Sequence, residues 1–195
     1  MNGKRRRLVM KVAMMLLCLG ITGCATTPMS SSQKAEQQAE VRDMAQTTLN
    51  QLYAQNPGAR DVVTKAAGYA VFTDYGFKLL IMGGAKGAGI AVNNATKQET
   101  FMKMAELQPG LGVGAEKYRV VFVFQDPAAF TSFVTSGWEA GANAMASAKT
   151  KTQGGALRGA ITVSQGVYMY QLTVEGLIVG VSLTGAKFYK DKELN

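Results

Sequence analysis

Two hydrophobic periods follow one another along this chain and divide it into a helical part and a strand-rich part. Over residues 34–55 the apolar positions return at steps of three and four, which places them on one stripe of a helix. Asn56-Pro57-Gly58 interrupts this pattern, and a second, short helix is predicted over residues 59–67 with Gly68 at its end. The stripe of the first helix consists of Val41, Met44, Ala45, Thr48, Leu49 and Leu52.

From Tyr69 onwards the sequence is built of short runs rich in Val, Ile, Phe and Tyr, which predict strands. Glycine, asparagine and Asp-Pro separate the runs, and Asn93-Asn94 indicates a hairpin. Residues 150–159 are rich in glycine and polar side chains and predict a mobile loop. The predicted strands are 69–72, 77–84, 87–93, 99–107, 118–124, 166–174 and 176–189.

One helix interrupts these strands. Asp126 is a favourable N-cap and Pro127 a favourable first residue, whereas Gly137 provides the end. Phe130, Phe133 and Val134 share one face of this helix. The order of elements predicts an α+β fold, with N-terminal helices packed on an antiparallel, Gly-rich sheet or barrel-like sheet with one inserted helix.

The first residues have the order of an export signal. A basic start precedes the apolar run Val12 to Ile21, which is too short to cross roughly 30 Å of hydrocarbon as a helix. Ile21-Thr22-Gly23-Cys24 resembles the lipobox of bacterial lipoproteins, in which the cysteine is acylated and the chain is cut before it. The alternative is a plain signal peptide whose cysteine is incidental.

These features predict a lipoprotein with three segments. Residues 1–23 would be the signal peptide, residues 24–33 a tether lipidated at Cys24, and residues 34–195 a single domain. Ala25 follows the cysteine where an aspartate could stand, which resembles lipoproteins sent to the outer membrane. The expected location is therefore the periplasmic face of the outer membrane.

Charge changes the picture little once the signal is set aside. The chain has 21 basic and 13 acidic residues and a formal charge of +8. Five basic residues and no acidic ones lie in residues 1–23, so 16 basic and 13 acidic residues remain, a net charge of +3. The basic residues are scattered, and we expect no nucleic-acid partner.

The residue types available for chemistry are few. The chain has no histidine, and its two cysteines, Cys18 and Cys24, lie in the signal and at the predicted acylation site. Catalysis by Cys-His or Ser-His-Asp and metal sites built on His or Cys are therefore excluded. The carboxylates show no recognisable paired spacing, so the sequence predicts no enzyme, no metal and no cofactor.

Two stretches resemble ligand sites. Gly83 to Gly89, "GGAKGAG", has the glycines of a phosphate loop, but a strand follows where a nucleotide site needs a helix. Lys86 is also misplaced for such a loop, so we interpret the glycines as bulges or positions of close backbone approach, with no nucleotide bound. Trp138, the only tryptophan, lies among small residues and is interpreted as a cap on the core rather than a ligand contact.

Three stretches together resemble the SYLF domain, a lipid-binding family shared by bacteria and eukaryotes. They are "AAGYAVFTDYGFKLLIMGGAKGAGIAVN", "VGAEKYRVVFVFQDPAAFTSFVTSGWEAGANA" and "GVYMYQLTVEGLIVGVSLTGAKFY", within residues 60–189. Eukaryotic members bind phosphoinositide membranes, partly through an amphipathic N-terminal helix, and some act with actin. Neither ligand is expected in a bacterial envelope, and the helix at 34–55 has little apolar bulk, so it could insert in a membrane or pack on the domain.

The resemblance implies a non-enzymatic lipoprotein of the cell envelope that binds membrane lipid, in particular anionic lipid. Cations at strand ends could contact lipid phosphates, although ordinary solvated side chains are the alternative for each. A second hypothesis is an envelope scaffold that binds another protein through the edge of its sheet. The candidate headgroup contacts are Lys78, Lys86, Lys117 and Arg119.

Overall fold

The computed structural model describes residues 29–116, 119–139, 159–173, 177–178 and 186–195, and within these ranges the side chains of 74–85, 106–116 and 177–178 are outside the description. Residues 31–195 form one compact unit. The predicted signal peptide, Cys24 and almost all of the predicted tether lie outside the described residues.

Two helices open the described chain. Helix α2 spans Ser31–Gln55, so it begins three residues before the predicted start, and helix α3 spans Gly58–Lys65. Pro57 lies between them with a φ of −55°, a value that suits the first turn of a helix. The apolar stripe predicted for α2 is confirmed, because its buried residues are Val41, Ala45, Thr48, Leu49 and Leu52.

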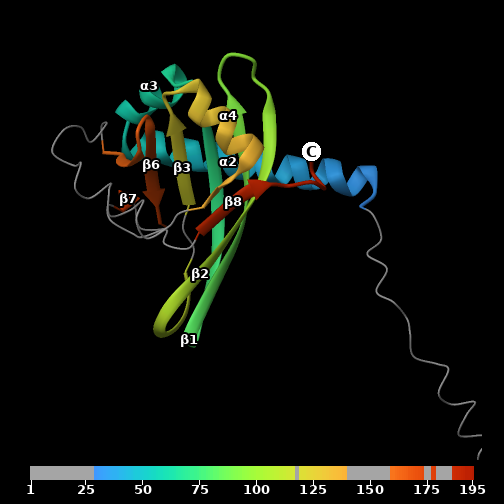
Figure 1. The fold of residues 1–195 in the computed structure, drawn as a ribbon, viewed down its shortest axis with the longest axis vertical. Coiled ribbons are helices and arrows are strands. Elements are labelled where there is room, and N and C mark those ends of the chain that lie inside the picture. Colours follow the sequence, from blue (N-terminus) through green and yellow to red (C-terminus); the bar gives the residue numbers. More distant parts are fainter. Residues whose placement is uncertain (1–28, 117–118, 140–158, 174–176, 179–185) are drawn as a thin grey trace, which may run out of the picture. The chain divides into compact units, whose positions relative to one another are not determined.

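The remainder is an antiparallel, curled sheet with one helix inserted between strands (Figure 1). Helix α4, Pro127–Ser136, follows the third strand, and the predicted α+β fold is confirmed. The described strands are paired in the order β4-β8-β2-β1-β3-β6-β5, and β7 also pairs with β6. Their bounds are β1 Gly68–Asn93, β2 Glu99–Glu116, β3 Arg119–Phe124, β4 Trp138–Glu139, β5 Ile161–Ser164, β6 Val167–Leu172, β7 Leu177–Ile178 and β8 Ala186–Lys190.

Strand β1 joins three runs that the sequence predicts as separate strands, and its two ends lie side by side. A Cβ atom placed on Gly68 would lie 2.8 Å from the carbonyl oxygen of Val92, and one placed on Gly89 would lie 2.6 Å from that of Val71. Only glycine allows the backbone to approach so closely. Close backbone approach is therefore confirmed at Gly89, and β1 continues as a strand through residues 83–89. The pairing with β2 also shows a register shift between Leu80 and Met82.

The predicted hairpin joins β1 to β2. The Asn93 side-chain oxygen accepts hydrogen bonds from the backbone N–H groups of Ala95 and Thr96, at 2.9 and 3.0 Å. Asn94 donates to the carbonyl oxygens of Val63 and Ala66 and so satisfies the last turn of α3. The two asparagines thus close the hairpin and fasten it to the preceding helix.

Helix α4 begins and ends as its sequence predicts. The Asp126 carboxylate accepts a hydrogen bond from the N–H of Ala128 at 2.9 Å, and Gly137 ends the helix with a φ of 75°. Phe130 and Phe133 are buried against the sheet. The core on this face consists mainly of Phe72, Met102, Met104, Phe122, Phe124, Phe130, Phe133, Met169 and Phe188.

Helix α2 lies against the opposite face of the sheet (Figure 1) and is tied to it along its length. Near its start Gln38 donates to the carbonyl oxygen of Leu194 at 2.7 Å, and near its end Gln51 donates to that of Thr173 at 3.0 Å. Because the apolar stripe is already buried by the domain, packing is the role that the structure gives this helix. No helix in the described part of the chain is long and apolar enough to span a membrane.

Candidate functional site

One part of the sheet is left uncovered by the described helices, on the face that carries α2. Register places Lys86 of β1, Ala105 of β2 and Lys187 of β8 in one cross-strand row. The next row contains Ala88, Lys103 and Tyr189. Residues directly opposite one another in antiparallel strands project from the same face. We call this surface the open face and define it by Lys86, Ala88, Lys103, Ala105, Lys187 and Tyr189.

Helix α2 marks the boundary of the open face. The following row, Ile90 and Phe101, is buried, and the guanidinium of Arg42 on α2 lies 5.1 Å from the centre of the Phe101 ring. Tyr189 on the open face is 39% exposed, the one large hydrophobic side chain so exposed in the described part of the chain. An exposed tyrosine between lysines has the composition of a surface that meets a polar–apolar boundary.

The three lysines of the open face differ in their partners. The Lys103 ammonium lies 2.8 Å from the Glu193 carboxylate and 3.2 Å from that of Asp191, and the hydrogen bond to Glu193 raises its pKa. Lys187 lies 4.0 Å from Glu139, and both side chains are more than 60% exposed, so this pair contributes little. Lys86 is exposed, and none of the ion pairs among the described residues uses it. Lys86 and Lys187 are therefore the cations that this face offers to a ligand.

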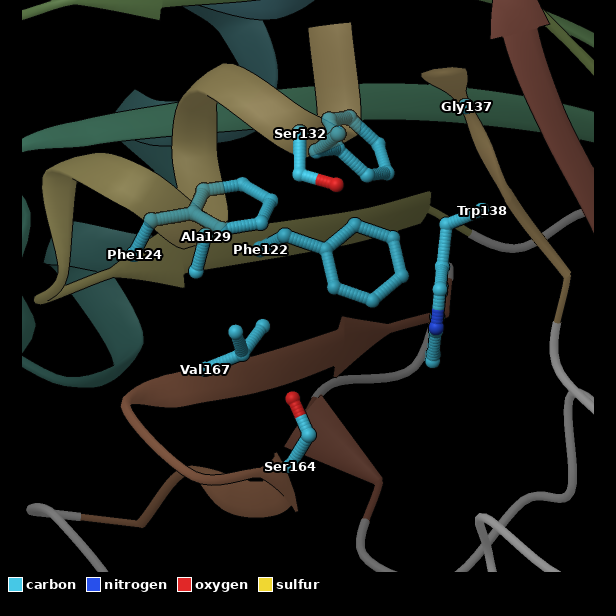
Figure 2. Close-up of a pocket in the computed structure, with 9 residues that line it drawn as sticks. Phe122, Phe124, Ala129, Ser132, Gly137, Trp138, Ser164 and Val167 are labelled. Carbon is cyan, nitrogen blue, oxygen red and sulfur yellow. The ribbon is translucent and has the colours of Figure 1, made fainter.

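A second feature is a cavity of about 180 Å³ between α4, β3 and β6, which we call the α4 pocket (Figure 2). Its inner wall is aromatic and aliphatic and consists of Phe122, Phe124, Phe133, Trp138 and Val167. The exposed side chains of Ser132 and Ser164 lie at its rim, and Ala129 and Gly137 complete the lining. Figure 2 shows the serines on opposite sides of the Phe122 ring.

The wall of the α4 pocket is held in place by its own contacts. Trp138 stacks on Phe188 with ring centres 5.8 Å apart, and its edge-on contact with Phe122 measures 5.6 Å. Phe122 also meets Phe133 at 5.9 Å. The N–H of Gly137 donates to the carbonyl oxygen of Phe133, so the chain turns directly from α4 into Trp138. The rings of the wall therefore pack on one another and on the core rather than standing free in the pocket.

The sequence-predicted contacts fall in different places. Lys86 lies on the open face, whereas the Arg119 guanidinium is half-buried and donates to the Gln51 side chain of α2 at 2.6 Å. That hydrogen bond gives Arg119 a role in holding α2, and the structure does not bring it together with Lys86. Lys117, Cys24 and the side chain of Lys78 lie outside the described residues.

Sequence reasoning missed Lys187, Lys103 and Tyr189. Lys103 joins Lys86 through the pairing of β1 with β2, whereas Lys187 and Tyr189 join it only because β8 pairs with β2, across more than 80 residues of chain. Alternation in Ala186 to Lys190 gives the one available signal, since Lys187 and Tyr189 alternate with buried Ala186 and Phe188. Trp138 was expected to cap the core, and it does so against Phe188 while also lining the α4 pocket.

Comparison with known proteins shows the family to which this chain belongs. Residues 105–195 match the Ysc84 family, described as "Las17-binding protein actin regulator". The chain carries a SYLF domain. It is also 34% identical over 161 residues to "Beta cell expansion factor A" of Aeromonas veronii, and the alignment covers 82% of this chain and 59% of that protein. The chain therefore spans about three fifths of the length of this relative.

The residues that match the family include the whole lining of the α4 pocket and half of the open face. All residues that line the α4 pocket lie between 105 and 195, within the matched part of the SYLF domain. The open face is divided, because Ala105, Lys187 and Tyr189 lie in the matched part and Lys86, Ala88 and Lys103 precede it. The open face therefore needs residues of the β1–β2 hairpin that lie before the matched residues 105–195.

Proposed function

We propose that the SYLF domain binds anionic lipid surfaces without catalysis and that its open face makes the contact. The observation that carries this proposal is the row of Lys86 and Lys187 with Tyr189 beside it on an uncovered sheet face. Exposed ammonium groups can meet lipid phosphates while a tyrosine ring enters the headgroup region.

The binding free energy expected from the open face is small, which favours a contact that assists a separate membrane anchor. Each lysine near an anionic surface contributes about 1 kcal/mol, so two contribute about 2 kcal/mol, or roughly a 30-fold enrichment. That is too little to hold a protein on a membrane alone, and stable attachment usually combines two signals. An acylated Cys24 would supply the other signal and place the domain in the bacterial envelope, on the periplasmic face of the outer membrane.

Vesicle flotation tests the open face. A Cys24→Ser chain that lacks residues 1–23 should float with vesicles that contain phosphatidylglycerol and much less with pure phosphatidylcholine. Adding Lys86→Ala and Lys187→Ala should weaken binding by about 30-fold at low salt. The matched control is Lys65→Ala with Lys97→Asn, which removes the same charge from α3 and the hairpin turn, where asparagine tolerates the positive φ of Lys97.

Two outcomes would count against the proposal. Equal losses in both double variants would mean that net charge alone governs binding. If the parent chain has no affinity for any vesicle, lipid binding is contradicted and a protein partner becomes the leading hypothesis. The anchor is tested separately, because Cys24→Ser in the native cell should release the protein from membranes or leave it unprocessed, and unchanged mass and fractionation would contradict acylation.

A further inference from the structure

The α4 pocket combines an apolar interior with side-chain polar groups only at its exposed rim. The rings of Phe122 and Phe124 and the side chain of Val167 are buried. The hydroxyl groups of Ser132 and Ser164 lie at the exposed edge. A ligand that satisfies this arrangement is apolar at one end and offers a hydrogen-bond acceptor at the other.

The size of the pocket restricts the ligand further. Apolar cavities of about 150 Å³ stay dry and hold a benzene-sized group. Sites that enclose a whole drug-sized molecule measure roughly 300–1,000 Å³. At about 180 Å³ the α4 pocket can therefore receive only one end of a longer molecule, whose remainder extends past the serines into solvent or into a membrane.

We propose that the α4 pocket binds the end of an alkyl chain of an amphiphile, such as a fatty acid or the acyl chain of a phospholipid. An unbranched chain can enter between ring edges, and the hydroxyl of either Ser132 or Ser164 can donate to a carboxylate or ester oxygen at the rim. This site is separate from the open face, and it does not depend on the lysines there.

Trp138 provides a direct readout, because it is the only tryptophan of the chain and lines the pocket. The test uses the Cys24→Ser chain, which cannot carry its own acyl groups, and decanoic acid with bromine on its terminal carbon. Bromine quenches indole fluorescence only at short range. We expect saturable quenching at concentrations where the acid is monomeric.

Two variants fill the pocket, and one neighbour serves as the control. Ala129→Leu adds bulk from the half-buried lining of α4, and Ser132→Leu adds it from the exposed edge, where it does not disturb the core. Both should weaken quenching at least 10-fold. Ala128→Leu, one residue away on the exposed side of the same helix, should leave it unchanged. Ser132→Ala should weaken it by about 2- to 10-fold through the lost hydroxyl.

A second arm separates the two sources of the alkyl chain. Phosphatidylcholine vesicles with brominated acyl chains replace the free acid, and quenching that Ala129→Leu abolishes would assign the chain to a bilayer lipid. Quenching by the free acid alone would assign a soluble monoacyl ligand. Lys86→Ala with Lys187→Ala should leave quenching by the free acid unchanged, so failure of the open face does not affect this test. Absence of saturable quenching in both arms, or equal quenching in all variants, would overturn the proposal.

Discussion

The two ends of the same sheet are used in opposite ways. Around β3 both faces are covered, because Val120 to Phe124 are all buried between α4 on one side and α2 on the other. Beyond the row of Ile90 and Phe101, strands β1, β2 and β8 are buried on one face only, and the other face carries Lys86, Lys187 and Tyr189. Backbone pairing continues from β3 through β1 and β2 to β8, so the difference lies in which side chains the helices cover.

This contrast teaches where stability and recognition reside. The covered end holds a network of ring contacts, with centres 4.8 to 6.4 Å apart, and can lose little without unfolding. The open face contributes little to the core and is free to present charge. Changes in the two regions should therefore separate into effects on folding and effects on binding.

The largest effect on stability is expected from removing a ring at the centre of the covered end. Phe122 is fully buried and contacts the rings of Phe72, Phe133, Trp138 and Phe188. Phe122→Ala should lower the free energy of unfolding by about 3–5 kcal/mol, measured by urea denaturation. Tyr189→Ala on the open face should lower it by less than about 1 kcal/mol, and a comparable loss in both variants would erase the distinction.

Gly89 tests the place where the two regions meet. A side chain here would collide with the Phe72 ring and the Val71 carbonyl oxygen. Gly89→Val should therefore cost about 1–3 kcal/mol or more of the free energy of unfolding, read from the midpoint of denaturation. Ala88→Val, one residue earlier on the open face, is the control and should change it by under about 0.5 kcal/mol. Similar values for the two would contradict the close approach of the ends of β1.

A pH-dependent effect should distinguish the α2 side of the covered end. Burial, with Tyr69 nearby, raises the pKa of Tyr53 to about 12 against the opposing Arg60 guanidinium. The unfolded chain loses this proton near pH 10, whereas the folded chain keeps it to about pH 12. The free energy of unfolding therefore has its full value below pH 10 and falls between about pH 10 and 12. Tyr53→Phe should reduce that loss in urea denaturation at pH 8 and pH 11. Tyr189→Phe is the control, and an unchanged alkaline loss in Tyr53→Phe would refute the assignment.

The smallest effect on stability is expected on the open face itself. Lys86→Ala with Lys187→Ala should change the free energy of unfolding by less than about 0.5 kcal/mol per site, because both side chains are exposed and the Lys187 pair with Glu139 is loose. The same variant should lose most of its vesicle binding. A large loss of stability in thermal denaturation would show that these lysines serve the fold.

The sequence predicts local elements well where the signal is local. The stripe from Val41 to Leu52, the N-cap Asp126 and the end at Gly137 all depend on neighbours within a few residues, and each is found in the structure. The sequence could not show that three predicted strands join into β1. Their arrangement depends on the close approach of Gly68 and Gly89 to backbone that lies about 20 residues away in the chain. Strands β4 and β5 were missed since their two and four residues carry almost no pattern.

The candidate sites depend even more on long-range contacts. Lys86 could be singled out by eye, but its companion Lys187 is supplied by β8 through pairing that no local pattern records. Arg119 looked equivalent to Lys86 in sequence, and its hydrogen bond to Gln51 appears only once α2 crosses the sheet. The α4 pocket is a gap between packed rings, and gaps follow from tertiary packing rather than from residue type.

The most direct test asks which surface meets the membrane. Cys24 is the only cysteine after residue 23, so a Cys24→Ser chain that lacks residues 1–23 accepts one labelled cysteine at a chosen site. An environment-sensitive fluorophore on Ala88→Cys, in the open face, should shift to the blue and brighten when vesicles containing phosphatidylglycerol are added. The same fluorophore on Ala54→Cys, exposed on α2, should stay in water. A response at Ala54 with none at Ala88 would contradict the assignment of the open face as the lipid-binding surface.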